Sequence, residues 1–388
     1  MYNLSTDELV SMGAEITTRE IKQQPELWLE ALETYLTKEK EIAVYLEELQ
    51  NKHQFLKVIF TGAGTSAYVG EIITPYLNQV NDQSKREFHA HATTDIVSNP
   101  NAYYQENIPT LLVSFARSGN SPESVAAVNL GKKLVKDFYQ LTITCAPEGA
   151  LAKAAVGDDK NLVILQPDRS NDQGFAMTGS FTCMTLTALL TFDMSNTSDK
   201  KAYVKAAVAM AESVFTRENE IQTLLDTDFD RVIYLGSGGF LGLAREAQLK
   251  ILELTAGKIT TAFDSSMGFR HGPKSFVNEQ SLVFVFVSND PYTRKYDLDI
   301  ISELTNDQIA SLVLPIQVAN GNQMADNGFN FSEDMKELPD AYLVLPYIIL
   351  GQTVALLSSI KVGNKPDTPS PTGTVNRVVK GVTIHELN

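Results

Sequence analysis

The chain carries one α/β unit twice, and this internal repeat limits the possible folds more than any other feature. From residue 58 an apolar run leads into Thr-Gly-Ala-Gly and then into a stretch of helical character. The same order, an apolar run followed by Leu-Gly-Ser-Gly-Gly, returns 174 positions later, so that Gly64 aligns with Gly238. A strand, a glycine turn and a helix form the unit that points a helix N-terminus at an anion. A repeat of this length is a duplicated domain, because each copy is long enough to bury its own core.

Length and composition agree with two such domains. A chain of 388 residues exceeds one ordinary domain, and its 43% hydrophobic fraction supports sizeable cores. Near-continuous apolar runs, such as 111–115 and 281–288, predict parallel strands buried on both faces. We expect an α/β fold in which each copy is a parallel sheet flanked by helices, in three layers. The expected parts are an N-terminal helical arm (1–50), the first copy (51–195), a helical connector (196–228), the second copy (229–360) and a tail (361–388).

The charge of the chain limits its partners. A net charge of −15 and a pI near 4.8 disfavour nucleic acid and anionic membranes, because the long-range field repels polyanions. A small phosphorylated ligand is compatible with this charge, since a pocket can be locally positive within an acidic surface.

Several features together predict a cytoplasmic protein. Cys145 and Cys183 lie in apolar contexts without disulfide or zinc spacing, so we expect buried thiols. The N-terminal segment lacks the apolar core of a signal peptide. The apolar stretch 341–360 contains Pro346 and Gln352, which favours a buried element over a membrane span.

A second polar loop follows an apolar run within the first copy. Its residues 116–123 read Ala-Arg-Ser-Gly-Asn-Ser-Pro-Glu and lead into a helical stretch. Hydroxyls and backbone N–H groups at the positive end of a helix suit a phosphate dianion. The alternative is an ordinary helix start with Ser121 as N-cap. We favour phosphate binding, because both loops fall at the carboxyl ends of strands, where ligands bind in such sheets.

The helix that follows Gly238 carries a candidate catalytic face. Glu246, Lys250 and Glu253 fall at i, i+4 and i+7, so all three project from one side of it. A surface salt bridge is the alternative. Downstream, Phe-Arg-His-Gly-Pro places His271, one of five histidines in the chain, in a loop bounded by glycine and proline.

These motifs in order resemble a known family. Leu-Gly-Ser-Gly, then Arg-Glu-Ala-Gln-Leu-Lys-Ile-Leu-Glu-Leu, then His-Gly-Pro is similar to the second sugar isomerase (SIS) half of glucosamine-6-phosphate synthase and its relatives. The length and the lack of a glutaminase half resemble the group of tagatose-6-phosphate ketose/aldose isomerases and galactosamine-6-phosphate deaminases. The resemblance covers about residue 45 to residue 388 and implies two tandem SIS domains.

The resemblance also implies roles for particular residues. Glu253 would move a proton between two carbons, His271 would open the sugar ring, and Lys380 in the tail would contact the C1–C2 region of the sugar. Lys380 taken alone reads as a solvated tail lysine. Glu246 and Lys250 would support Glu253, and the histidine would come from a neighbouring subunit, which implies a homodimer or a dimer of dimers. The implied phosphate-binding set is Gly64, Thr65, Ser66, Arg117, Ser118 and Ser121.

The phosphate loop departs from the family pattern. The family's loop usually reads Ser-Gln-Ser-Gly-Glu-Thr, whereas this chain has Ala-Arg-Ser-Gly-Asn-Ser, with Arg117 and Asn120 as the main changes. A planar guanidinium can bind phosphate through two hydrogen bonds, so we expect phosphate binding to be kept. The change leaves open which sugar the pocket prefers.

The predicted activity is an aldose-ketose isomerisation of a phosphorylated hexose or hexosamine, with no metal and no organic cofactor. The chain shows no His, Asp and Glu set at metal-ligand spacing. Deamination of galactosamine-6-phosphate to tagatose-6-phosphate and ammonia is our first choice, and isomerisation of tagatose-6-phosphate or galactose-6-phosphate without ammonia release is the alternative. A non-catalytic phosphosugar sensor that reads DNA would carry a basic arm, but residues 1–50 are acidic. The amide-transferring synthase needs an N-terminal cysteine, and Tyr2 stands there instead.

Overall fold

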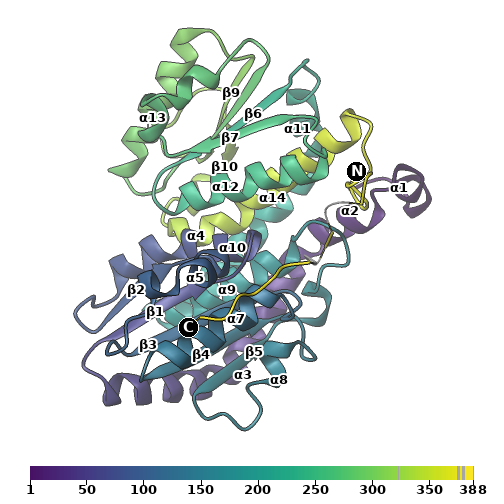
Figure 1. Ribbon diagram of the computed structural model, residues 1–388. Coiled ribbons are helices and arrows are strands. Elements are labelled where there is room, and N and C mark those ends of the chain that lie inside the picture. The colour runs from purple at the N-terminus through teal and green to yellow at the C-terminus, as the bar shows by residue number, and fades with distance from the viewer. Residues whose placement is uncertain (322, 374–375, 378–380, 388) are drawn as a thin grey trace. The chain divides into compact units, whose positions relative to one another are not determined.

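Figure 1 shows the computed structural model, which describes residues 1–321, 323–373, 376–377 and 381–387. The chain forms two compact units. The first-sheet unit comprises Glu26–Asp172, Met177–Thr197 and Val375–Asn388, and the second-sheet unit comprises Met1–Pro25, Gln173–Ala176 and Ser198–Thr374. The finer boundaries of arm, connector and tail stay a prediction.

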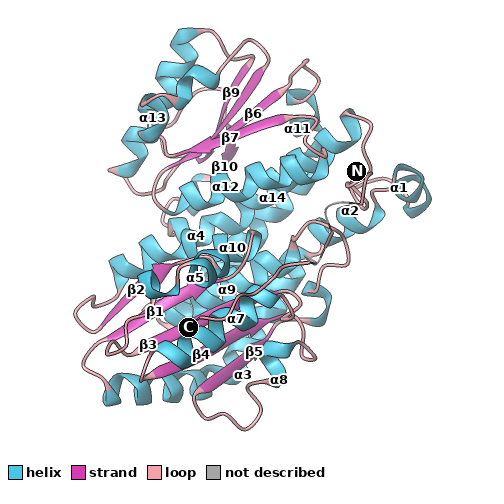
Figure 2. Ribbon diagram, viewed as in Figure 1, coloured by secondary structure: helices cyan, strands magenta, loops and turns pink. Residues whose placement is uncertain are grey.

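The first-sheet unit is built on five parallel strands in the order β2-β1-β3-β4-β5 (Figure 2). Every residue of β1, β3 and β4 is buried, because helices cover both faces of the sheet. The strands are β1 Leu56–Thr61, β2 Arg86–Ala90, β3 Thr110–Ala116, β4 Phe138–Thr144 and β5 Asn161–Leu165. The helices are α3 Gln24–Lys52, α4 Thr65–Val80, α5 Thr93–Ser98, α6 Pro100–Tyr103, α7 Pro122–Leu134, α8 Ala150–Lys153 and α9 Gly179–Phe192.

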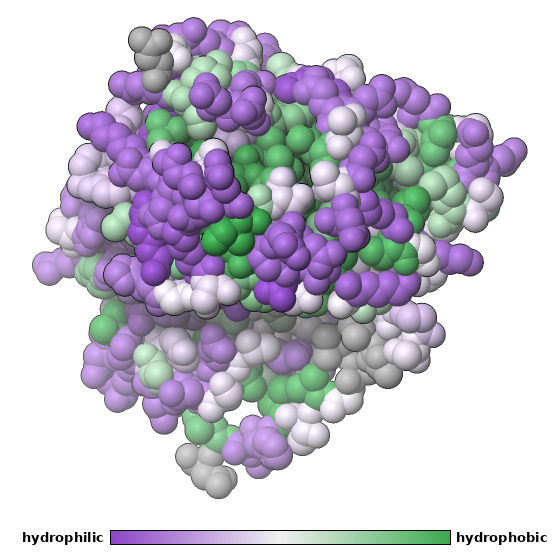
Figure 3. Space-filling view, turned by 90° about the horizontal axis from the view of Figure 1, so that it is seen from above, coloured by the Kyte–Doolittle hydropathy of each residue, from purple (hydrophilic) through white to green (hydrophobic). Residues whose placement is uncertain are grey.

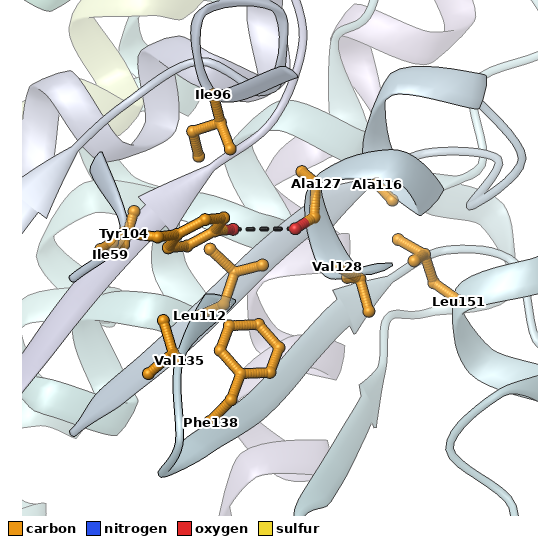
Figure 4. Close-up of a cluster of buried hydrophobic side chains, with 10 residues drawn as sticks. All are labelled: Ile59, Ile96, Tyr104, Leu112, Ala116, Ala127, Val128, Val135, Phe138 and Leu151. Atoms are coloured by element: carbon orange, nitrogen blue, oxygen red, sulfur yellow. Dashed lines mark hydrogen bonds between the residues drawn. The ribbon is translucent and has the colours of Figure 1, made fainter. Parts of the chain in front are cut away.

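One face of this sheet packs against helices and forms the hydrophobic core drawn in Figure 4. Side chains of β1, β3 and β4, among them Ile59, Leu112 and Phe138, meet apolar residues of α5 and α7. The hydroxyl of Tyr104 donates to the carbonyl of Ala127 at 2.9 Å, as the dashed line in Figure 4 marks. A satisfied hydroxyl of this kind keeps the core free of a desolvation cost. The core fixes α7, whose N-terminus faces the candidate site.

The second-sheet unit repeats the same plan. Its parallel strands follow the order β10-β9-β8-β6-β7, which is the order of the first sheet read from the other edge. The strands are β6 Arg231–Gly236, β7 Thr260–Asp264, β8 Ser281–Phe286, β9 Leu312–Val318 and β10 Phe329–Phe331. The helices are α1 Thr6–Met12, α2 Glu15–Lys22, α10 Thr197–Thr216, α11 Glu218–Leu224, α12 Gly239–Leu254, α13 Thr293–Asp307 and α14 Asp340–Lys361.

The two glycine turns have nearly the same backbone. Gly64, before α4, has φ 56° and ψ −131°, and Gly238, before α12, has φ 57° and ψ −127°. Only glycine adopts such angles without strain, so the repeated glycines are required by the turn. The predicted fold class, two tandem α/β units preceded by N-terminal helices, is confirmed.

The longest apolar stretch is a helix of the core. Among the described helices, α14 is long and apolar enough to cross a membrane, but 89% of its apolar window is buried inside the protein. The sequence-based expectation of a buried element is therefore confirmed. On the face seen in Figure 3, hydrophilic residues predominate and hydrophobic ones lie between them.

Candidate active site

The candidate residues fall into two groups, one in each unit. The phosphate-binding candidates belong to the first-sheet unit, and Glu246, Lys250, Glu253 and His271 belong to the second-sheet unit. Lys380 lies outside the described residues.

A small cavity of about 110 Å³ opens at the carboxyl ends of β1 and β3. Three of the predicted serines and Arg117 face it together, as their positions at strand ends lead one to expect. Gly64 and Thr65 belong to the same turn as Ser66 but are not among the lining residues. The lining residues are Ala63, Ser66, Phe115, Ala116, Arg117, Ser118, Gly119, Ser121, Glu123, Ser124, Met177 and Arg377.

Arg117 supplies a buried cation to this cavity. Its side chain is 7% exposed, and its guanidinium donates to the backbone carbonyl of Arg377 at 2.6 Å. A guanidinium has five N–H donors in a fixed plane, and this geometry suits the oxygens of a phosphate. The cavity therefore has a positive wall inside a chain whose net charge is −15.

The serine hydroxyls of this loop bond to residues close to them in the chain. Ser121 occupies the N-cap position of α7 without capping it; its hydroxyl instead shares a 2.6 Å hydrogen bond with that of Ser124. Ser118 Oγ accepts a long bond of 3.4 Å from the N–H of Asn120. Ser121 is thus the N-cap residue of α7, as the alternative has it, although its hydroxyl accepts no backbone N–H, and the phosphate-binding role of the loop stays a prediction.

Two charged residues of the cavity, Arg377 and Glu123, were not predicted. Arg377 donates to Asn171 Oδ1 at 3.0 Å and to the backbone carbonyl of Asp172, which ties the tail to the cavity wall. Glu123 is 8% exposed, and its Oε2 atom has no hydrogen-bond partner among the described residues. No local pattern marks Arg377, because its partner Arg117 lies 260 positions away in the chain.

The second group forms a buried ion triad on α12. Lys250 Nζ lies 3.2 Å from Glu246 Oε1 and 2.7 Å from Glu253 Oε2. The Glu246 and Lys250 side chains are 0% and 1% exposed, so the alternative of a surface salt bridge is wrong. Burial opposes the charge of Lys250, but the two carboxylates outweigh it and raise the pKa of the ammonium above its usual value. Lys250 is therefore charged at neutral pH.

Glu253 is the member of the triad that reaches the surface. Its side chain is 22% exposed, whereas its two partners are buried. An ammonium that bridges two carboxylates holds Glu253 in one orientation. A carboxylate that is oriented and accessible can take a proton from carbon in a bound substrate.

His271 lies in an exposed loop beside α13. Its backbone N–H donates to Gly268 at 2.9 Å, between the 3₁₀ turns Gly268–Arg270 and Pro273–Phe276. Ion pairs of 2.6 and 2.5 Å join Arg270 and Lys274, on either side of it, to Glu303 of α13. The loop is thus anchored while the imidazole faces solvent.

Among the described residues, no group of three or more His, Cys, Asp or Glu side chains is arranged to hold a metal ion.

Comparison with known proteins defines the class. A family model described as SIS domain matches residues 48–192, the core of the first-sheet unit. Two tandem parallel α/β sheets together with this match define a SIS-domain protein.

Relatives over the full length narrow the family. D-galactosamine-6-phosphate deaminase AgaS of Shewanella sp. (strain ANA-3) is 42% identical and matches over 98% of this chain and 95% of its own. The crystal structure of a putative tagatose-6-phosphate ketose/aldose isomerase from Clostridium novyi NT superposes with a TM-score of 0.92 and 40% identity, over 100% of this chain and 99% of that one. The crystal structure of tagatose-6-phosphate ketose/aldose isomerase from Escherichia coli superposes with a TM-score of 0.85 and 39% identity, over 95% of this chain and 96% of that one. The chain belongs to the SIS-domain family of these AgaS deaminases and ketose/aldose isomerases, so the resemblance seen in the sequence is confirmed.

Proposed function

We propose that the protein is a deaminating sugar-phosphate isomerase that converts galactosamine-6-phosphate to tagatose-6-phosphate and ammonia in amino-sugar catabolism. The observation that carries the proposal is the near-full-length identity of 42% to relatives named D-galactosamine-6-phosphate deaminase. The site chemistry agrees with it, since the chain offers an anion pocket at Arg117 and an accessible carboxylate at Glu253.

The reaction needs no redox step. The substrate phosphate binds at Arg117, Ser118 and Ser121, and His271 assists the proton transfers that open the ring to the C1 aldehyde. Glu253 removes the C2 proton, the C1 oxygen takes up a proton, and the resulting enaminol carries an amine on C2. Return of a proton to C1 leaves an iminium at C2, water adds there, and ammonia leaves to give the ketose.

Isomerisation without ammonia release is the second candidate. It is favoured by the solved relatives named tagatose-6-phosphate ketose/aldose isomerase. Both reactions use the same proton transfer and differ in whether C2 carries nitrogen or oxygen.

A substrate panel separates the two candidates. We expect ammonia and tagatose-6-phosphate from galactosamine-6-phosphate, little ammonia from glucosamine-6-phosphate, and slow ketose formation from galactose-6-phosphate. Ammonia would be followed through glutamate dehydrogenase and the ketose by NMR, with the Glu253→Gln protein as the blank. Faster turnover of galactose-6-phosphate than of galactosamine-6-phosphate would replace the first proposal with the second.

We further propose that the working form is a homodimer or a dimer of dimers in the cytoplasm and that His271 completes the site of a neighbouring subunit. Support comes from the position of His271 in an exposed, anchored loop. Mixing inactive Glu253→Gln subunits with inactive His271→Asn subunits should then restore part of the activity. Hybrids that form, as shown by native mass spectrometry, and yet stay inactive would rule out a shared site.

A further inference from the structure

The two copies can be aligned position by position beyond the glycine turns. Lys57 of β1 pairs with Thr110 of β3, and Arg231 of β6, 174 positions after Lys57, pairs with Ser281 of β8. Positions after β3 therefore correspond to positions 171 further on. The following helices keep this offset, because α7 begins at residue 122 and α13 begins at residue 293.

The charges at three corresponding positions differ in a regular way. The first copy has the cation Arg117 where the second has the hydroxyl residue Ser288. On the helix that follows, the anion Glu123 corresponds to the cation Arg294, and the small residue Ala126 corresponds to the anion Asp297. The first copy thus has its cation in the loop after the strand and an anion on its helix, whereas the second has both a cation and an anion on its helix.

Asp297 fills the strand-end region of the second sheet. It is 0% exposed and accepts hydrogen bonds from Ser237 Oγ at 2.6 Å, from Ser266 Oγ at 2.5 Å and from the N–H of Ser288 at 3.0 Å. Ser237 lies in the glycine turn after β6, Ser266 follows β7, and Ser288 follows β8. One carboxylate thus collects hydroxyl and N–H donors from three strand ends, which is what a bound phosphate does at such an edge.

Arg294 is a buried cation near Asp297. Its side chain is 1% exposed and donates to the carbonyls of Gln323 at 2.6 Å, Val318 at 2.8 Å and Ser288 at 3.0 Å. Its positive charge acts to lower the pKa of Asp297, although burial is the larger effect and raises that pKa overall. In the first copy the corresponding region is the open cavity with Arg117 in its wall.

We propose that Asp297 is a built-in substitute for a ligand phosphate, so that the second copy closes with a side chain the anion site that the first copy keeps open. The inference rests on the proposed phosphate site at Arg117. Each chain then binds one phosphorylated ligand. Asp297 also becomes a positioning residue, because Ser237 lies in the turn that opens the helix of Glu253 and Ser266 lies five positions before His271.

Chemical rescue tests the need for an anion at this position. In an Arg117→Ala background, which silences the first site, Asp297→Ala removes the carboxylate and leaves a hole of formate size. We expect the double variant to unfold at a lower Tm and sodium formate, at about ten times its Kd, to raise that Tm by about 3–6 °C. The matched variant Asp297→Asn fills the hole with an amide. Formate should therefore raise its Tm by no more than it raises the Tm of the Arg117→Ala protein. Sodium chloride at equal ionic strength is the salt control.

Titration of the unmutated protein with inorganic phosphate gives a measurement that does not depend on variant folding. We expect about one phosphate per chain by calorimetry, with loss of that binding in Arg117→Ala. Two phosphates per chain, or no formate-specific shift in folded Asp297→Ala, would overturn the inference about Asp297. Phosphate binding that survives Arg117→Ala unchanged would instead overturn the proposed phosphate site, so the two failures are distinguishable.

Discussion

At the scale of single residues, the members of the triad on α12 have different proposed roles: Lys250 positions Glu253, and Glu253 reacts with the substrate. Lys250 bonds two carboxylates, and only Glu253 of the three side chains reaches solvent. Replacing Glu253 by glutamine keeps the shape and removes the base. We expect kcat to fall about 100-fold or more while KM changes little, in line with typical contributions of a general base.

Proton exchange checks this assignment directly. The Glu253→Gln protein should lose exchange of the substrate C2 proton with solvent deuterium, followed by NMR. Glu279→Gln makes the same chemical change at an exposed position of the same unit and should behave as the unmutated protein. Exchange at the unmutated rate in Glu253→Gln would show that another group is the base.

Substitution of Arg117 tests substrate binding, whereas substitution of Glu253 tests the chemical step. Loss of one charge-assisted contact costs about 1.5–3 kcal/mol, so Arg117→Ala should raise KM for the phosphorylated substrate about 10- to 150-fold. The control Arg169→Ala removes an arginine of the same unit whose partners, Glu26 and Glu30, are exposed carboxylates, and it should leave KM unchanged. Circular dichroism of both variants would verify the fold. An unchanged KM in Arg117→Ala would remove this residue from the site.

The cysteines allow a test of burial. Burial raises the pKa of Cys145 to about 12, against a weaker opposing effect of the hydrogen bond from Ser170, and it raises the pKa of Cys183 as well. Only the thiolate reacts with disulfide reagents, so near pH 8 the folded protein should react about 1000-fold more slowly than a free thiol, with about 8.5 as the pKa of the latter. Both thiols should titrate with Ellman's reagent after unfolding in guanidinium. Rapid modification of the folded protein would contradict the predicted burial.

At the scale of elements, the buried helix α9 depends on one carboxylate at its start. Asp172, 0% exposed, accepts from the N–H groups of Thr178 at 3.0 Å, Gly179 at 2.9 Å and Ser180 at 3.0 Å and from the hydroxyls of Thr178 and Ser180. These bonds satisfy donors that the first turn of a helix cannot satisfy internally. Every residue of α9 is buried, so water cannot replace the cap.

Asp172→Ala should therefore destabilise the first-sheet unit. Several buried donors lose their acceptor, and we expect a loss of about 3–5 kcal/mol in the free energy of unfolding. Urea unfolding followed by circular dichroism measures the loss. Asp168→Ala, an exposed aspartate four positions earlier, should change the free energy by about 0.5 kcal/mol or less. Equal effects of the two substitutions would show that the cap does not stabilise α9.

Elements differ in how far the sequence predicts them. The strands β1, β3 and β8 are continuous apolar runs, and the sequence located them because central strands of a parallel sheet are buried on both faces. The strands β2 and β7 lie at sheet edges with mostly half-buried residues, so they carry no such run and were missed. β10 has only three residues and gives no pattern.

The site residues, like the strands, divide into those that the sequence predicts and those that it misses. The spacing on α12 predicted that Glu246, Lys250 and Glu253 share one face, because helical geometry is local. It did not predict that Glu246 and Lys250 are buried, on a helix along which α14 packs. Arg377 and Asp297 were missed because their partners come from distant parts of the chain.

At the scale of the whole molecule, duplication produced two sheets with the same strand order and different contents at their carboxyl edges. The first copy holds an open cavity with a buried arginine, and the second holds a buried carboxylate. The catalytic candidates Glu253 and His271 stand on the copy whose edge is filled. A filled edge gives these side chains a rigid support in the absence of substrate.

The carboxylate of Asp297 also sets how each half of the chain responds to the supply of metabolites. A unit that binds a dissociable anion gains stability only as the concentration of that anion rises above its Kd. A unit whose anion is encoded in the sequence stays saturated at every concentration. When sugar phosphate runs out, the first-sheet unit alone loses this protection, so during starvation proteases should begin degradation of the enzyme in that half while the half that carries Glu253 stays intact.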